Sequence, residues 1–544
     1  MRRSLARLLR TTLGISSWFV ASACGSADGG GDPALGTDSG LGDAPLVDGG
    51  GCADPVKPKT SCGGVCVDTT TDPANCGSCG VVCGGGTSCC DSRCVGAASC
   101  SFALTNVDPG GGFQNGGDWL TLKGAGFVAG MKVFIGDGRA PVRVVDANTA
   151  TIQTPPGKVG VVDVKIVAAS GTSAVLTKAF TYTSAGLSTP WEQKPMAKVR
   201  GEDPAVAVLQ DGRVLVAGGT TVPDSTADAL NTAELYTRKT DKVVPTANTM
   251  STARWQDAAI TLLDGRALVV GGACGDDGST CGAGSDPTIA DLFDPKTNMF
   301  TASKSKLNKP RLYPRAVLMV DGRVLISSAN DASIEIYDPD KDTFTLVPHT
   351  DLHLWGFVVR LRDGRVLLGG GDSGVTKVET FDADTGTFAA VGPLAQGRSM
   401  LTAHTLPDGR VFVVGGSSLS AGGIHVPLDS IESFDPTTNA WTTLPYKLTI
   451  GRTWLASALV RDGTILAMGG YTIDGKCDSL SDTVDQIDPV AGTVKPFAKL
   501  PNANTEWNAV TLLDGSVLGV GGGACGTGTA LPDLDFLPGA GGPT

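Results

Sequence analysis

A short phrase centred on Asp-Gly recurs seven times along the second part of the chain. Its copies, such as DGRVLVAGG and DGRALVVGG, follow one another at intervals of 42 to 57 residues. An apolar run precedes each copy, and Asp-Gly suits a two-residue turn because glycine tolerates positive φ. Each unit holds four strand-like parts, which predicts the four-stranded blades of a β-propeller. The copies begin at Asp211, Asp264, Asp321, Asp363, Asp408, Asp462 and Asp514.

These units resemble kelch repeats, and the resemblance extends over residues 185–544. The third copy departs from the pattern, because Ser327-Ser328 stands where the others carry Gly-Gly. Its implied architecture is a seven-bladed kelch-type propeller in an all-β protein.

The last repeat predicts how the ring closes. It reaches the strand-like Asp533–Phe536 and then lacks a fourth strand. A segment just before the first repeat, Thr189–Lys198, resembles the fourth strands of kelch repeats. Pairing of this segment with the last unit would leave no open sheet edge.

Residues 101–184 carry a different pattern of short strands separated by turns. Apolar residues alternate at Val133 and Ile135 and again at Val164 and Ile166, as in half-buried strands. Several such strands in about 80 residues suggest an immunoglobulin-like sandwich. The phrases GGDWLTLKGAGF, Thr154-Pro155 and Phe180-Thr-Tyr182 resemble an IPT/TIG domain. Domains of this family are mostly spacers or binding modules outside cells.

Ten cysteines crowd into residues 52–100. This density in a short exported segment predicts a disulfide-stapled module, whose pairing the sequence leaves open. Zinc binding through Cys62, Cys66, Cys76 and Cys79 is the alternative. No histidine precedes His349, and an oxidising compartment disfavours free thiolates.

The first 24 residues predict export. Four arginines precede a short apolar run, and Ala-Ser-Ala leads to Cys24. This ending resembles a bacterial lipobox, which implies acylation at Cys24 and a lipoprotein of the outer membrane or cell surface. Cleavage without acylation would instead give a secreted or periplasmic protein. Residues 25–51, rich in Gly and Asp, predict a flexible tether.

The composition excludes several classes of partner. The chain has 55 acidic and 43 basic residues, and a pI near 4.9. Its acidity argues against nucleic acid and against adsorption to anionic lipid. Beyond the N-terminus no apolar run is long enough for a membrane span, so a lipid anchor is the only membrane contact that we expect.

Loop geometry indicates where a ligand would bind. The loops between the second and third strands vary most in length, and they share one face with the loops that enter each first strand. Cations and aromatic residues recur at the start of the first strands, which suggests a collar at the channel mouth. The alternative is structural: the arginines would tie blades together and the aromatic rings would pack between sheets. The residues are Arg254, Trp255, Arg311, Tyr313, His353, Trp355, Arg398, Arg452, Trp454 and Trp507.

The four propeller cysteines fall in loops of this face. Cys274 and Cys281 enclose six residues, which predicts a local disulfide. Cys477 and Cys525 occupy the same loop of consecutive blades, where a disulfide would join blades six and seven.

No complete catalytic motif is present. Kelch-type copper oxidases resembling galactose oxidase use two Tyr and two His, whereas none of the six Tyr here adjoins one of the four His. We therefore expect no cofactor, no metal and no catalytic residue. The predicted function is non-catalytic binding of an extracellular protein or glycan; the alternative is a secreted oxidase or glycan-active enzyme.

Overall fold

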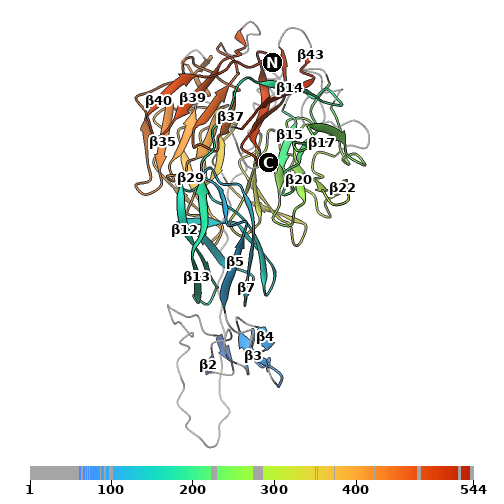
Figure 1. Ribbon diagram of the computed structural model, residues 1–544, viewed down its shortest axis with the longest axis vertical. Coiled ribbons are helices and arrows are strands. Elements are labelled where there is room, and N and C mark those ends of the chain that lie inside the picture. The colour runs from blue at the N-terminus through green and yellow to red at the C-terminus, as the bar shows by residue number, and fades with distance from the viewer. Residues whose placement is uncertain are drawn as a thin grey trace, which may run out of the picture. The chain divides into compact units, whose positions relative to one another are not determined.

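The computed structural model describes residues 60–96 and 102–539, apart from short gaps. In the first range these are residues 63–64, 68, 70–71, 73, 86 and 91–92; in the second they are 202, 222–228, 274–285, 350, 352, 373, 421–422, 474–478 and 525–528. Over these ranges the regular elements are all β-strands (Figure 1). The chain divides into two compact units, residues 1–97 and 98–544, which we describe separately. Within the described ranges, no helix has the length and hydrophobicity that a membrane crossing requires.

Disulfides hold the first unit together. It contains two small hairpins, β1 (Thr60–Cys62) with β2 (Val65–Val67) and β3 (Thr87–Cys90) with β4 (Arg93–Gly96). Three disulfides connect them to the intervening loops, and these six cysteines are therefore unavailable as zinc ligands. The pairs are Cys62–Cys79, Cys76–Cys89 and Cys83–Cys94. The predicted disulfide-rich segment is confirmed for this part of the chain.

The second unit begins with a two-sheet sandwich. One sheet has the order β10-β11-β7-β5 and the other β6-β13-β12-β8-β9. Val133, Ile135, Val164 and Ile166 are fully buried between the sheets, as their alternation predicts. The strands are β5 (Ala103–Asp108), β6 (Gly111–Phe113), β7 (Trp119–Ala125), β8 (Lys132–Ile135), β9 (Gly138–Ala140), β10 (Val142–Asp146), β11 (Thr149–Gln153), β12 (Gly160–Val167) and β13 (Ser173–Thr183).

Seven four-stranded antiparallel blades follow, and each unit of the sequence repeat forms one of them. The first blade has β15 (Ala205–Val208), β16 (Val214–Ala217), β17 (Ala233–Thr237) and β18 (Lys242–Pro245). The second has β19 (Ala258–Thr261), β20 (Ala267–Val270), β21 (Asp291–Asp294) and β22 (Met299–Ala302). The third has β23 (Arg315–Leu318), β24 (Val324–Ser327), β25 (Ile334–Asp338) and β26 (Thr343–Val347). The fourth has β27 (Phe357–Arg360), β28 (Val366–Gly369), β29 (Val378–Asp382) and β30 (Thr387–Ala390).

The remaining blades have the same strand order. The fifth has β31 (Thr402–Thr405), β32 (Val411–Val414), β35 (Ile431–Asp435) and β36 (Ala440–Thr443), with a loop hairpin of β33 (Ser417–Leu419) and β34 (His425–Pro427). The sixth has β37 (Ala456–Leu459), β38 (Ile465–Met468), β39 (Val484–Asp488) and β40 (Thr493–Pro496). The seventh has β41 (Thr505–Thr511), β42 (Val517–Ala524) and β44 (Asp533–Leu537), and β43 (Thr529–Ala530) pairs with the end of β42.

The ring closes through a strand from before the first blade. β14 (Glu192–Pro195) pairs antiparallel with β44, and Glu192 lies opposite Phe536. Fourth-strand pairing by the Thr189–Lys198 segment is thus confirmed. Behind this seam, Trp191 packs into the hydrophobic cluster between blades six and seven.

The repeated Asp-Gly-Arg phrase has a local structural reason. In the second blade, Asp264 accepts a hydrogen bond from the backbone N–H of Arg266 at 3.0 Å, and Gly265 between them has φ +93°. In every blade but the third, Gly-Gly stands at or near the end of the second strand, where the backbone of the next blade comes close. A Cβ on Gly271, for example, would lie 2.7 Å from the carbonyl oxygen of Arg311 in the next blade.

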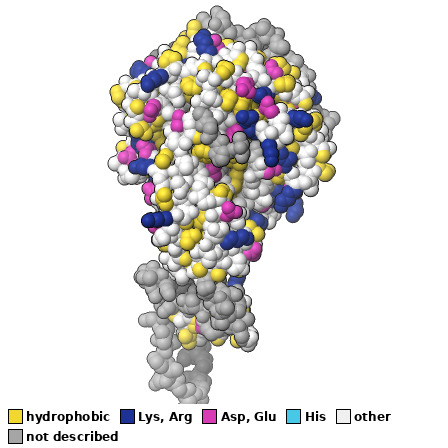
Figure 2. Space-filling view, in the orientation of Figure 1, with side chains coloured by type: hydrophobic (Ala, Val, Ile, Leu, Met, Phe, Trp, Pro, Cys, Tyr) yellow, Lys and Arg dark blue, Asp and Glu magenta, His cyan; other side chains and the backbone are white. Residues whose placement is uncertain are grey.

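The hydrophobic core is divided among the interfaces between neighbouring blades. Phe412 and Val414 of blade five, for example, pack with Ile465 and Ala467 of blade six. Blades seven and one share a cluster in the same way, so the apolar contacts continue around the ring. On the outer face in view, basic and acidic side chains are interspersed, with no large patch of one sign (Figure 2).

The sandwich docks on the Asp-Gly turn side of the ring. Its Val142 N–H donates to Val320 O of blade three, and its Arg139 N–H donates to Arg362 O of blade four. At a distant part of the ring, Arg461 of blade six donates to Gly116 O of the sandwich at 3.1 Å. The sandwich thus contacts blades three, four and six at this end of the propeller.

Candidate functional site

One residue of each blade, just before the first strand or within its first two residues, has a left-handed backbone conformation. The φ angles of these seven residues lie between 42° and 55°. Such values are uncommon outside glycine and carry a conformational cost, so their repetition requires a shared cause. We call this set the mouth ring. Its members are Asp203, Gln256, Tyr313, Trp355, Met400, Trp454 and Glu506.

Backbone hydrogen bonds between consecutive blades provide that cause. Met400 N–H donates to Trp355 O at 2.8 Å, and Trp454 N–H donates to Met400 O at 3.3 Å. Where the ring closes, Asp203 N–H donates to Glu506 O at 2.9 Å. The left-handed turn thus places these side chains on a rigid belt at the start of the inner strands.

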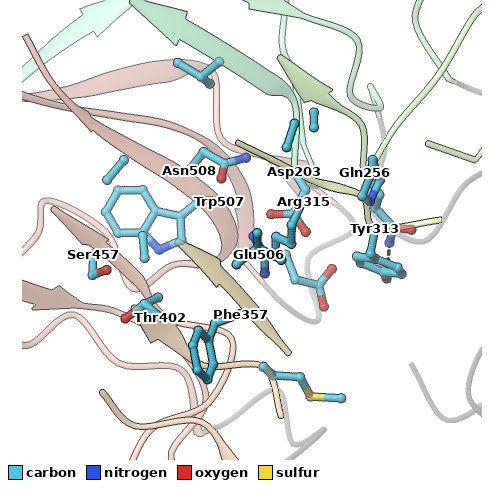
Figure 3. Close-up of a pocket in the computed structure, with 18 of the residues that line it drawn as sticks. Asp203, Gln256, Tyr313, Arg315, Phe357, Thr402, Ser457, Glu506, Trp507 and Asn508 are labelled. Atoms are coloured by element: carbon cyan, nitrogen blue, oxygen red, sulfur yellow. Dashed lines mark hydrogen bonds between the residues drawn. The ribbon is translucent and has the colours of Figure 1, made fainter. Parts of the chain in front are cut away.

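The aromatic members of the mouth ring meet one another. The ring centroid of Tyr313 lies 6.2 Å from that of Trp355 and 5.6 Å from that of Trp454. The amide of Gln256 donates a hydrogen bond to the Tyr313 hydroxyl (Figure 3). The indole N–H groups of Trp355 and Trp454 have no acceptor among the described residues. Three aromatic rings therefore gather at one place, together with two indole N–H groups that are buried without a partner.

A cavity of about 300 Å³ adjoins the mouth ring. Its walls come from the first strands of all seven blades, including Arg315, Phe357, Thr402 and Ser457 (Figure 3). A lining with contributions from every blade places the cavity on the propeller axis. Binding sites of this kind combine apolar walls with a few placed polar groups.

Charged groups share this cavity. Burial raises the pKa of Asp203 to about 6, and the nearby Arg315 opposes the shift. Burial raises the pKa of Asp257 to about 7, although the positive charges of the nearby Arg254 and Arg200 act to lower it. Arg315 keeps accessible surface although it lies deep in the ring, because it points into the cavity. Figure 3 shows Asp203, Arg315 and Glu506 next to one another, a group that can accept and donate hydrogen bonds.

The four arginines of the sequence-predicted collar lie inside their own blades. Each is fully buried, lines no part of the cavity, and forms an ion pair with a carboxylate of the third strand. The N–O distances are 2.8 Å for Arg254–Asp291, 3.2 Å for Arg311–Glu335, 2.6 Å for Arg398–Glu432 and 3.0 Å for Arg452–Asp485. Arg200 of blade one pairs with Glu234 in the same way. These arginines are therefore structural and lie outside the candidate site, but each stabilises its own blade and does not tie neighbouring blades together.

The aromatic residues of the predicted collar separate into two groups. Tyr313, Trp355 and Trp454 lie in the mouth ring, and Trp507 is buried in the cavity wall. Trp255 pairs through its backbone with Ala273 and does not line the cavity.

Sequence reasoning did not single out Gln256, Glu506, Asp203 or Arg315. Gln256 and Glu506 occupy the same position in their repeats as Trp355, two residues after the position of the buried arginines. This equivalence in the repeat could have identified them from the sequence. Cys24, Cys274, Cys281, Cys477 and Cys525 lie outside the described residues.

The fold places the protein in a structural class, that of a kelch-type β-propeller preceded by an IPT/TIG-type domain. The IPT/TIG domain family matches residues 103–182, and the kelch motif matches residues 401–447. Among similar solved structures is one described as a novel fungal alcohol oxidase with catalytic diversity among the AA5 family, in complex with copper. It is 18% identical, with a TM-score of 0.52, and the match covers 65% of this chain and 76% of that chain. No curated protein matches the chain in sequence.

The described residues of the cavity do not fit the copper site expected for galactose-oxidase-like enzymes. That site takes two Tyr and two His, whereas the cavity lining contains one tyrosine, Tyr313, and no histidine. His404 binds Ser457 Oγ at 2.6 Å, and burial lowers its pKa to about 4. His425 lies beside Ser417 in a loop hairpin. The donor set therefore supports no copper chemistry on the axis.

Proposed function

We propose that this protein is a non-catalytic binding protein that receives a glycan at the mouth ring. The observation that carries the proposal is the convergence of Tyr313, Trp355 and Trp454 beside an axial cavity. Aromatic faces pack against the apolar faces of sugar rings.

The polar groups of the cavity support this choice of ligand. Gln256, Asp203 and Glu506 carry acceptor oxygens for sugar hydroxyls, and Arg315 supplies donors. The sandwich contacts blades three, four and six on their Asp-Gly turn side, so a ligand would enter from the opposite face. A chain end or a single branch of a glycan suits a cavity of about 300 Å³.

A panel of immobilised glycans tests the proposal. Wild-type protein should bind a subset of the panel, and Trp355→Ala should lose that binding. Tyr446→Ala removes an aromatic side chain from the outer part of the ring, where it packs between blades five and six, and should bind like wild type. Binding of no glycan, or equal loss in both variants, would refute the proposal. A partner captured equally by Trp355→Ala would point to a protein ligand on another surface.

We also propose that the protein is exported and carries a lipid at Cys24. The supporting features are the arginine-rich start, the short apolar run and Ala-Ser-Ala-Cys. Metabolic labelling with a fatty acid should mark the wild type and leave Cys24→Ser unlabelled; an unlabelled wild type would favour a released protein.

The alternative is a secreted oxidase or glycan-active enzyme, which the likeness to an alcohol oxidase favours. Metal analysis of protein purified with copper in the medium addresses it directly. Stoichiometric copper together with alcohol-dependent peroxide formation would establish the oxidase.

A further inference from the structure

Blade four departs from the arginine–carboxylate pattern of blades one, two, three, five and six, as does blade seven, where Asn504 takes the position of the arginine. Its third-strand carboxylate, Glu379, is buried like those of the other blades, but His353 occupies the position of the arginine. A buried carboxylate without a cation is costly, so Glu379 requires either a positive charge or a proton beside it.

Two imidazoles converge on the same carboxylate oxygen. His349 Nε2 lies 2.6 Å from Glu379 Oε1, and His353 Nε2 lies 3.0 Å from that oxygen. Both histidine side chains are more than nine-tenths buried. His349 also packs on Phe388, with ring centroids 4.4 Å apart.

The partners of His353 limit where its proton sits. Its Nδ1 lies 3.0 Å from Gly370 O, a carbonyl that can only accept, so Nδ1 carries the proton. In the neutral ring Nε2 is then a bare lone pair facing the lone pairs of Glu379. Either a proton shared by these two atoms or a metal cation bound to both resolves the contact, and the Nδ1–H to carbonyl bond is the usual support of a metal-binding histidine.

A second carboxylate completes the group. Asp351 Oδ2 lies 3.8 Å from His349 Nε2 and is partly exposed, and Lys377 pairs with it. One ligand atom each of His349, Asp351 and Glu379 lies within 4.8 Å of the others. Nδ1 of His349 is buried without a hydrogen-bond partner, so no second bond holds this ring against turning toward an ion.

We propose that His349, His353, Asp351 and Glu379 bind a divalent transition-metal ion, with Zn²⁺ as the best fit. Imidazole nitrogens and carboxylate oxygens are zinc ligands with bonds of about 2.0–2.2 Å, which places tetrahedral ligand atoms about 3.3 Å apart. The contacts of 3.0 and 3.8 Å lie on either side of that value, and the His349–Glu379 contact of 2.6 Å would lengthen by about 0.7 Å on binding.

The ion would replace the missing arginine and join two blades. His349 follows β26 of blade three, His353 precedes β27 and Glu379 lies in β29 of blade four. Zinc bound here would hold the connection between blades three and four in place, whereas each buried guanidinium of blades one, two, three, five and six holds strands within its own blade. The site lies apart from the axial cavity, since none of the four residues lines it.

Zinc titration of the full-length protein, after removal of metals by a chelator, tests the proposal. Calorimetry should show one saturable site lost on substitution of His349 or His353, and zinc should raise the melting temperature of the wild type. The informative variant is His353→Arg, which restores the arginine–carboxylate pair of the other blades. It should remain folded, lose this zinc site and lose the zinc-dependent rise in melting temperature.

Two controls distinguish zinc binding at this site from zinc binding by other residues of the protein. His425→Ala removes a histidine beside Asp372 in a different loop and should leave zinc binding unchanged. Cobalt substituted for zinc should show a d–d spectrum without a thiolate charge-transfer band. The proposal is overturned if the wild type shows no saturable binding, if His353→Arg binds zinc like wild type, or if the cobalt spectrum reports cysteine ligation.

Discussion

The rings of Tyr313 and Trp454, from the third and sixth blades, lie with their centroids 5.6 Å apart. These blades are not neighbours, so the contact spans the mouth of the propeller axis. Each residue is held by a left-handed backbone turn, which makes the aromatic cluster part of the framework of the ring.

Trp454→Ala should weaken glycan binding about tenfold or more, because central aromatic contacts carry a large share of binding energy. Its melting temperature should change little, since Trp454 is only partly buried. Titration calorimetry with the best glycan of the panel and a thermal melt measure the two effects.

Trp507→Ala provides the contrast. Trp507 is 4% exposed and packs between blades six and seven, so its loss should cost about 3–5 kcal/mol of unfolding free energy. Equal destabilisation by Trp454→Ala would mean that the mouth aromatics act in packing.

Arg398→Ala should destabilise the protein by about 3–5 kcal/mol, because it leaves Glu432 buried without its cation. Replacement of the whole pair by apolar residues, as in Arg398→Met with Glu432→Leu, should recover much of that loss. Urea unfolding of the two variants and the wild type gives the comparison.

An exposed pair serves as the control for this experiment. Lys499 and Asp482 are 2.9 Å apart but largely open to solvent, so Lys499→Ala should change stability by less than about 1 kcal/mol. A similarly small effect of Arg398→Ala would contradict the role of the buried pairs.

The free energy of unfolding should fall as pH rises from 4 to 8, in part because Asp257 loses its proton over this range. Its folded pKa of about 7 lies above the ordinary value of 3.8, so the protonated form stabilises the fold. This contribution is complete below pH 3.8 and lost as pH rises through 7, and amounts to at most about 4 kcal/mol. Asp257→Asn should flatten the dependence measured by urea unfolding between pH 4 and 8.

Asp384→Asn is the matched control. The hydrogen bond from Arg139 lowers the pKa of Asp384 to about 2, so its titration lies below this range and its loss should leave the slope unchanged. An unchanged slope in Asp257→Asn would show that this carboxyl does not titrate there.

The repeating phrase predicted the propeller and its seam because Asp-Gly turns and apolar strands are local features with a fixed period. The buried pairs escaped that reasoning: nothing in the spacing of Arg398 and Glu432 says that a third-strand carboxylate turns toward the arginine. The cavity escaped it too. Arg315 and Asp203 come from different blades, and only closure of the ring brings their charges into one space.

Arg461→Ala should uncouple the sandwich from the propeller. Arg461 donates to Gly116 O and to the Asn115 side chain, and its guanidinium lies 3.0 Å from Asp118 and over the Phe113 ring. Its side chain is only 2% exposed, so these contacts are shielded from solvent.

Loss of that anchor should split one calorimetric unfolding transition into two, with the sandwich melting first, and should speed proteolysis near residues 184–190. Arg143→Ala removes only an exposed pair with Asp340 and should keep a single transition. If Arg461→Ala also melts in one unshifted transition, the docked arrangement does not depend on this residue. If the wild type already shows two transitions, the sandwich unfolds independently of the propeller.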